Sequence, residues 1–333
     1  MQKIYANGKA DATLKVPTMT GIHTILLPAR PQTDTIIAIF LLRSFGDEKF
    51  PGIKEAKIES TFKGPQTASF DSLLAEGQLA LDMADGPFDH HSRGGTASQL
   101  VAHQLGIEND QMIGQLLQLA ERDDKLGKGT LSTDQLDRAF GLAGLITALN
   151  KSFPGDPNTV IDRICAVLEG HLAEQRRRFT ELPQEFEEKK KNNQVVEFRF
   201  VQGGTSMKGV FIVSDSLSIA GWLRSRLGPQ ADVIVQQRSS GHVNILTKQE
   251  RKIELSVAAA LIRSAEMAER GNTAELDMQT LARPGTIAEV PNWYYDTATN
   301  SLLNGGSTPD STEPTVVPHS YLLTLVRKGL ENS

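Results

Sequence analysis

Three adjacent side chains, Asp89, His90 and His91, are the residues of this chain best suited to chemistry. They follow a glycine-proline turn, and a further carboxylate, Asp82, stands upstream of them. Carboxylates and imidazoles together are suitable ligands for a divalent ion such as Mn²⁺ or Zn²⁺. The pattern therefore predicts a metal site that assists reactions of phosphate esters. The alternative is a surface turn in which an imidazole caps a helix and Asp89 accepts backbone hydrogen bonds.

The elements that would position these residues have the pattern of an α/β sheet. A short apolar run precedes a helical segment rich in Ile, Leu and Phe, which indicates the first strand, loop and helix of such a sheet. The strands are expected at 23–27, 56–62 and 78–82, and the helix at 35–45. Ligands of open α/β sheets gather at the carboxyl ends of the strands. We therefore expect Asp34, Asp82 and Asp89 along one rim.

Helical patterns continue after the candidate site. The expected helices are 96–106, 111–121, 134–150 and 158–191. The second of these helices is followed by Asp123 and Asp124, which add two carboxylates. A turn signal at 154–157 precedes the last helix. The polar end of that helix indicates a solvated connection between two domains.

The last part of the chain predicts a smaller domain of mixed α/β structure. Its expected strands are 195–201, 209–213, 232–236 and 243–246, and its expected helices are 216–227 and 253–270. The tail from Gly285 is rich in turns, which indicates a hairpin or lid. The fold class is therefore α/β, with a parallel-sheet domain over 1–152, a connecting helix over 153–193 and the mixed domain over 194–333.

Composition restricts the classes of protein that this chain can represent. A formal net charge of -5 argues against coating nucleic acid through bulk electrostatics. The single cysteine, Cys165, excludes a disulfide within the chain and a cysteine-rich zinc site, and it is expected on a buried helix face. No apolar run reaches the roughly 18 residues that span a bilayer, and the N-terminus lacks a signal-peptide pattern. We expect a cytoplasmic protein without a membrane partner, and the sequence leaves a homodimer open.

A resemblance to a known family rests on the candidate site. The run from Asp82 through Phe88, Asp89, His90 and His91 resembles the signature of the DHH phosphoesterase superfamily. The segment 86–91 most resembles the exonuclease-like branch of eukaryotic organelles and many bacteria. The order of acidic positions is also similar, from a loop before the first helix to the end of a later helix. The likeness covers roughly residues 20–150 by motif, and 194–270 resemble the accessory substrate-binding domain loosely.

The resemblance implies a DHH-like metal-binding domain and a metal-dependent phosphodiesterase or exonuclease. Its substrates would be short oligonucleotides or cyclic and linear dinucleotides, bound in a cleft between the domains. The metal would be Mn²⁺, with Mg²⁺ as the alternative. The implied metal ligands are Asp34, Asp82, Asp89, His90 and Asp124. With Asp89, His91 would act in catalysis by orienting or protonating a group near the scissile phosphate.

The first motif departs from the family pattern. Gln32 stands where the family has a His, and Thr35 stands where it has a second acid. Neither is a comparable metal ligand, so the affinity for two divalent ions should fall. The alternative is a catalytically inactive nucleotide-binding or regulatory protein on the same scaffold. At the fourth acidic position, Asp123 remains a rival to Asp124.

Two further segments are candidates for substrate binding. Arg93 lies in 92–96, where a guanidinium and the N–H groups at a helix start would hold a phosphate. The segment 238–242 resembles the family's glycine-rich substrate loop, with serines in place of glycines. Its candidate contacts are Arg238, Ser240, Gly241 and His242. The alternative readings are a capped loop for the first segment and a turn between two strands for the second.

Overall fold

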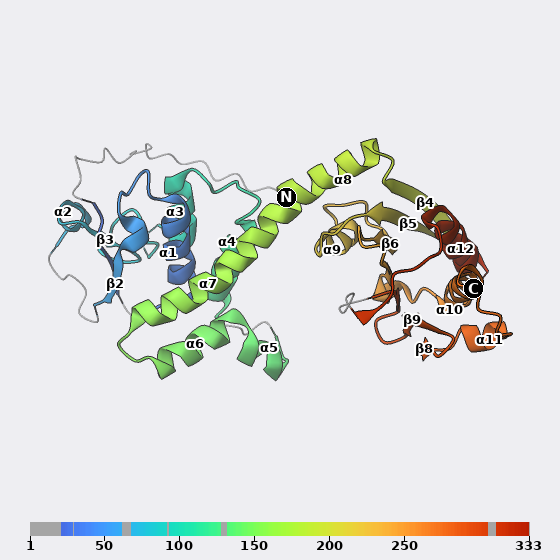
Figure 1. The fold of residues 1–333 in the computed structure, drawn as a ribbon. Coiled ribbons are helices and arrows are strands. Elements are labelled where there is room, and N and C mark those ends of the chain that lie inside the picture. The colour runs from blue at the N-terminus through green and yellow to red at the C-terminus, as the bar shows by residue number, and fades with distance from the viewer. Residues whose placement is uncertain are drawn as a thin grey trace. The chain divides into compact units, whose positions relative to one another are not determined.

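The computed structural model describes residues 21–28, 30–61, 68–91, 93–127, 132–305 and 311–332. The chain divides into two compact units, unit 1 (Met1–Gln175) and unit 2 (Arg176–Ser333), whose elements are labelled in Figure 1. The N-terminal segment 1–20 and Ser92, both used in the sequence analysis, lie outside the described residues. In the described part of the chain, no helix combines the length and apolar character needed to cross a membrane.

Unit 1 contains a parallel sheet with the strand order β2-β1-β3. Its strands are β1 (Thr24–Leu27), β2 (Lys57–Ser60) and β3 (Gln78–Ala80). Every residue of β1 is buried, as expected of a parallel strand with a neighbour on each edge. The chain leaves β1 for β2 and then returns to the other side of β1, so the strand order reverses between β1 and β3. Such reversals are where α/β sheets bind ligands.

A buried helix follows the central strand. In α1 (Thr33–Phe45), the residues from Thr33 to Leu42 are all buried, so the helix lies inside the unit. It packs against α3 (Ala97–Leu105) and α4 (Gly114–Leu126). The short elements between the strands are η1 (Ile53–Glu55) and α2 (Phe70–Ala75). The parallel sheet and its helices confirm the α/β class for this part of the chain.

The helix expected over 134–150 is two helices, α5 (Gln135–Phe140) and α6 (Leu142–Ser152). Gly141 separates them with an extended backbone, and a Cβ at this position would lie 2.6 Å from the Asp137 carbonyl oxygen. The expected apolar face is therefore divided. Phe140 is 71% exposed, whereas Ile146 is buried.

The long helix expected over 158–191 is present in three consecutive parts. They are α7 (Pro157–Arg176), the π-helical turn η2 (Arg177–Glu181) and α8 (Leu182–Lys191). The boundary between the two units falls inside this stretch, after Gln175. Cys165 is buried in α7, and burial raises the pKa of its thiol to about 11, which confirms the expected inert core thiol.

Unit 2 contains a mixed sheet with the strand order β4-β5-β6-β7-β10-β9-β8. The strands are β4 (Val195–Gln202), β5 (Thr205–Val213), β6 (Val233–Gln237), β7 (Val243–Thr247), β8 (Gly285–Ile287), β9 (Val290–Asp296) and β10 (Ser301–Leu303). Only β5 and β6 are parallel neighbours in this sheet. The mixed sheet confirms the expected class of the C-terminal part. The hairpin expected from Gly285 is present as β9 and β10, which belong to the sheet.

Helices cover both faces of this sheet. They are α9 (Ile219–Arg224), η3 (Gln249–Arg251), α10 (Ser256–Glu269), α11 (Met278–Leu281) and α12 (His319–Glu331). Successive strand residues alternate between faces, so Phe211 packs in the core with α10 and α12, and Ile212 packs with α8 and α9. The sequence did not predict α12. It crosses α10 at Gly329, where a Cβ would lie 2.4 Å from the Ala258 Cα, so only glycine permits this approach.

A buried carboxylate joins the elements of unit 2. Glu266 on α10 is completely buried. Its oxygens accept hydrogen bonds from Arg270 Nε, Asn292 Nδ2, Trp293 Nε1, Thr315 Oγ1 and the Val316 N–H. Burial alone would raise the pKa of Glu266, but these hydrogen bonds hold it below its usual value. The carboxylate therefore ties α10 to β9 and to the segment before α12.

We expect Glu266→Gln to lower the free energy of unfolding of unit 2 by about 3 kcal/mol at neutral pH, because the amide cannot accept all these bonds. The folded-state pKa lies below the ordinary value of 4.5. The contribution of Glu266 is therefore complete above that pH and is lost as the pH falls through the folded-state pKa. The difference between the variant and the wild type should shrink on acidification. Urea unfolding at several pH values measures it.

Tryptophan fluorescence restricts this measurement to unit 2, since Trp222 and Trp293 are the only tryptophans of the chain. The matched control is Glu269→Gln, an exposed carboxylate on the same helix, which should change stability little. Equal losses in the two variants would contradict the structural role of Glu266.

Candidate metal centre

The loop after β3 has an unusual backbone. Asp82, Ala84 and Asp85 have φ angles of 60°, 66° and 49°. This is the left-handed region, which residues other than glycine adopt infrequently and alanine less readily than aspartate. Each such residue costs on the order of 1 kcal/mol or more, and such strain is concentrated at functional sites. The surrounding structure must therefore hold this loop in place.

Phe88 provides part of that support. Its side chain is fully buried, and its ring packs edge-on against Phe50 and Phe70 with both centroids 6.0 Å away. Its carbonyl accepts a hydrogen bond of 3.2 Å from the Asp82 N–H. The apolar anchor thus closes the loop between Asp82 and the triplet that follows Phe88.

Asp89 provides the remaining support for the loop after β3. One of its carboxylate oxygens accepts the Asp85 N–H at 3.0 Å, and the other accepts the His91 N–H at 3.1 Å. The second oxygen also lies 2.8 Å from His91 Nδ1. Asp89 was predicted to be a metal ligand, and in the structure it is buried behind His91, with both oxygens engaged by the loop. A carboxylate in this place orients an imidazole that can act on a metal or a proton.

Asp82, His90 and His91 present ligand atoms that all lie within 4.8 Å of one another. Asp82 Oδ1 is 3.2 Å from His90 Nε2 and 3.5 Å from His91 Nδ1. Two ligands that each lie about 2.1 Å from one ion are separated by about 3.0–3.5 Å. The spacing of these three side chains therefore suits a shared cation.

Two more carboxylates lie near Nδ1, the other ring nitrogen of His90. His90 Nδ1 is 3.8 Å from Asp124 Oδ2 and 4.0 Å from Asp34 Oδ2. Asp34 is buried near the start of α1, and its oxygens also accept the N–H groups of Ala97 and Ser98 at the start of α3. The structure thus brings the predicted ligands of α1 and α4 to the same imidazole.

The rival carboxylate Asp123 faces elsewhere. It is buried and lines a separate pocket of about 390 Å³ together with Arg122 and Arg138. Of the two neighbours, Asp124 is the one that lies within 4.0 Å of His90 among the described residues. The direction in which α4 turns its side chains decides between them, and the sequence pattern did not specify this rotation.

The polar atoms of this group fit a divalent cation. Among the described residues, Asp82 Oδ1 and His90 Nδ1 are buried and have no hydrogen-bond partner. Buried polar atoms are nearly always paired, so the unpaired Asp82 oxygen that faces His90 Nε2 indicates a missing ligand. A carboxylate and two imidazoles are suited to Mn²⁺, Zn²⁺ or Fe²⁺. Asp34 and Asp124 add the negative charge that a cation requires.

The charges of the group interact strongly. Burial raises the pKa of Asp82 to about 6, although the imidazoles of His90 and His91 oppose this shift. The hydrogen bond to Asp89 raises the pKa of His91. Burial would raise the pKa of Asp89 as well, but hydrogen bonds from the His91 ring and from two backbone N–H groups lower it. A bound cation would favour the ionised form of Asp82.

The start of α3 differs from the expected phosphate-binding site. Asp34 accepts the first two N–H groups of the helix, and Thr96 Oγ1 accepts the third, from Gln99. These groups are therefore occupied by the protein itself, contrary to the expectation that they bind an anion. Arg93 is exposed and donates a hydrogen bond of 3.3 Å to the Asp85 carbonyl, so its guanidinium lies on the strained loop.

The two departures in the first motif have a structural role. Gln32 is the N-cap of α1, and its N–H donates a hydrogen bond of 2.9 Å to Thr35 Oγ1. The Thr35 hydroxyl in turn donates to the Gln32 carbonyl. Both residues therefore serve the helix start, next to Asp34, and supply no ionised ligand.

The candidate substrate loop lies in unit 2, between β6 and β7. The Arg238 N–H bonds the His242 carbonyl, and the Gly241 N–H bonds the Arg238 carbonyl, so the loop is a tight turn. His242 is buried, and its Nε2 donates to the Thr312 carbonyl at 2.8 Å because that oxygen can only accept. Its Nδ1 lies 2.8 Å from Ser240 Oγ. The imidazole is therefore held firmly by the turn.

Comparisons with models of protein families, with curated proteins and with solved structures found no match to this chain. The geometry of the side chains therefore carries the functional argument.

We expect Mn²⁺ affinity to rise with pH through about pH 6, where Asp82 loses its proton. The pKa of Asp82 in the metal-free protein is about 6, and only the ionised carboxylate binds a cation. Below that pH, a proton competes with the metal, and affinity should fall by about tenfold per pH unit. Protonation of His91, whose pKa is raised by the hydrogen bond to Asp89, acts in the same direction and extends the rise above pH 6. Isothermal titration calorimetry with Mn²⁺ between pH 5 and pH 8 measures the effect.

The control for this titration is His103→Ala, which removes an exposed imidazole on α3 and should leave the profile unchanged. An affinity that does not change between pH 5 and pH 6 would contradict the assignment of Asp82 as a ligand.

Proposed function

We propose that the protein is a divalent-metal-dependent phosphodiesterase or exonuclease that acts on short oligonucleotides or on cyclic or linear dinucleotides. The observation that carries this proposal is the convergence of Asp82, His90 and His91, with two buried polar atoms left unpaired among the described residues. The resemblance of the same residues to the DHH phosphoesterase signature supports the reaction class. Mn²⁺ is the proposed metal, and Mg²⁺ is the alternative.

The residues of the candidate metal centre have different proposed roles. Asp82 and His90 Nε2 would hold the metal, which when bound would neutralise the phosphate and activate a water molecule. Asp34 and Asp124 lie near the other ring nitrogen, Nδ1, and would add negative charge to the centre. Asp89 holds the His91 ring through the 2.8 Å contact. His91 is largely exposed, so it would hold a proton beside the scissile phosphate as a general acid.

Two cationic groups are proposed to bind substrate. Arg93 would hold a phosphate oxygen next to the metal centre through its guanidinium. In unit 2, the turn with Arg238, Ser240, Gly241 and His242 is proposed as a separate nucleotide-binding element. The Arg238 guanidinium is the group of this turn that suits a phosphate, because the Ser240 hydroxyl donates its hydrogen to His242 Nδ1.

A second function is favoured by one observation. Gln32 and Thr35 are engaged with each other at the start of α1 and provide no ligand where the family has two. A protein that has lost these ligands would bind nucleotides or act as a regulatory partner without turnover. This alternative predicts nucleotide binding that does not require metal.

We expect Asp82→Asn to abolish Mn²⁺ binding and to lower Mn²⁺-dependent cleavage of a dinucleotide about 100-fold or more. Asparagine tolerates the left-handed backbone at this position, so the loop should keep its shape. Elemental analysis of the purified protein and turnover with a panel of dinucleotides and short RNA or DNA are the measurements. His103→Ala is the control. Cleavage retained in Asp82→Asn would refute the proposed centre.

We expect the double variant Gln32→His and Thr35→Asp to raise metal-dependent turnover about tenfold, because it restores an imidazole and a carboxylate. An aspartate at position 35 still accepts the N–H at position 32, so α1 should begin as before. The measurement compares initial rates at limiting Mn²⁺. If the wild type and this variant both bind nucleotide and neither hydrolyses it, the non-catalytic alternative is favoured.

A further inference from the structure

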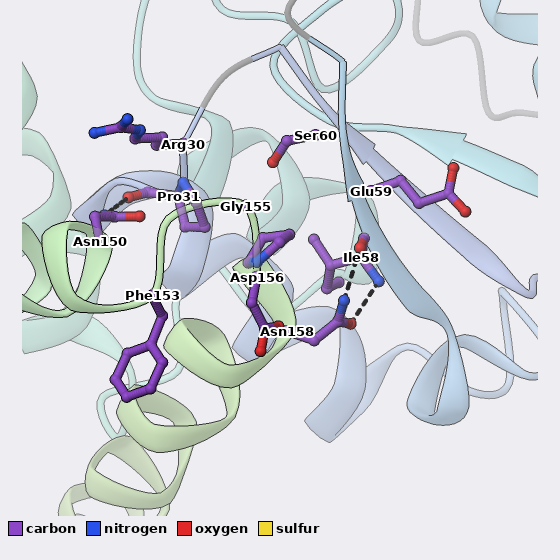
Figure 2. A pocket seen from close by; sticks show the side chains of 11 residues that line it. Arg30, Pro31, Ile58, Glu59, Ser60, Asn150, Phe153, Gly155, Asp156 and Asn158 are labelled. Carbon is purple, nitrogen blue, oxygen red and sulfur yellow. Dashed lines mark hydrogen bonds between the residues drawn. The ribbon is translucent and has the colours of Figure 1, made fainter.

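A pocket of unit 1 is lined in part by the loop that leads from β1 into α1. It has a volume of about 340 Å³, near the lower end of the roughly 300–1,000 Å³ of small-molecule sites. Figure 2 shows its lining, which comes from the loop after β1, the end of β2, the end of α6 and the start of α7. The loop that supplies Arg30 and Pro31 continues into α1, where Asp34 faces His90. The loop that lines the pocket therefore leads directly into the helix that carries Asp34.

The edge of β2 faces this pocket. Lys57 and Thr61 direct their N–H groups to β1, so the alternate residues Ile58 and Ser60 direct theirs outward. At Ile58, the Asn158 side chain closes the edge: its Oδ1 accepts the N–H at 2.8 Å, and its Nδ2 donates to the C=O at 2.9 Å (Figure 2). A side-chain amide thus pairs with one residue of the strand through one donor and one acceptor.

Ser60 is the next residue of β2 whose N–H donor and C=O acceptor face outward, and these two groups have no partner within the described ranges. No group within the described ranges bonds the Ser60 N–H or C=O, or the Arg30 guanidinium. The pocket opens at this place and is walled by the apolar side chains of Pro31, Ile58 and Pro157. Asn150 holds the loop through a 2.8 Å bond to the Pro31 carbonyl. The pocket therefore combines apolar side chains, an unpaired donor and acceptor, and the Arg30 cation, and Glu59 and Asp156 also line it.

We propose that this pocket binds the base of a nucleotide, with the Ser60 peptide groups on the hydrogen-bonding edge of the base and Arg30 on a phosphate. Each nucleobase presents an adjacent donor and acceptor on its pairing edge. This inference rests on the proposed function, since it assigns a place to one base of the substrate. A peptide strand does not fit, because Asn158 already occupies the preceding pairing position of β2.

Binding of nucleoside monophosphates in the presence of EDTA tests the pocket separately from catalysis. The probes are AMP, GMP, CMP and UMP, followed by calorimetry or by NMR of the full chain. We expect Ser60→Pro to weaken binding about tenfold, because proline removes the outward N–H and is tolerated on an edge strand. Ser60→Ala separates the hydroxyl from the N–H, and the loss in the proline variant should exceed the loss in the alanine variant.

Arg30→Gln provides a second variant that does not depend on the strand. It should weaken the binding of monophosphates about tenfold and leave the binding of nucleosides unchanged. The control is Glu55→Gln, which changes an exposed carboxylate that does not line the pocket. Wild-type binding in both Ser60→Pro and Arg30→Gln, or no monophosphate binding by the wild type, would overturn the proposal.

The metal centre and the pocket can fail independently in this design. If Asp82→Asn abolishes turnover but Ser60→Pro and Arg30→Gln bind monophosphates as the wild type does, the pocket proposal is overturned and the proposed function stands. If no protein turns over any dinucleotide but the two pocket variants lose binding as expected, the pocket proposal is supported and the hydrolase proposal fails.

Discussion

The left-handed backbone at Asp82, Ala84 and Asp85 is the constraint on which the candidate metal centre depends. A chain that left β3 in an extended conformation would carry the next carboxylate and imidazoles away from Asp82. Three positive φ angles turn it back, so that Asp82 faces His90 and His91. The loop persists because Phe88 is buried and Asp89 accepts two backbone N–H groups. The first contribution of Asp89 is therefore to the shape of the site.

Two buried carboxylates show how burial can serve different purposes. Glu266 is surrounded by donors from its own unit, which hold its pKa low, so its charge is fully used in holding the fold. Asp82 has an unpaired oxygen among the described residues, and burial raises its pKa. Repulsion by Asp34 and Asp89 adds to the cost of its charge. A cation would remove this cost, which is the physical reason for placing metal chemistry at Asp82.

Much of the fold follows from local patterns of the sequence. A short apolar run indicated β1, a partly alternating run indicated β4, and an apolar run indicated β5. The break at Gly141 was missed because its extended backbone interrupts an otherwise continuous helical pattern. The helix α12 was missed because the preceding turns and prolines dominated the reading of the tail. Its place depends on a close approach between Gly329 and Ala258, which are far apart in the sequence.

The sequence by itself determined which groups could meet, because strand ends of a parallel sheet share one edge and Asp34 and Asp82 follow two neighbouring strands. Only the tertiary structure decided how they meet. The rotation of α4 brings Asp124 to His90, and the bonds within the loop place Asp89 behind His91. Both outcomes depend on backbone angles and packing between distant segments. A pattern of residue types along the chain does not specify these quantities.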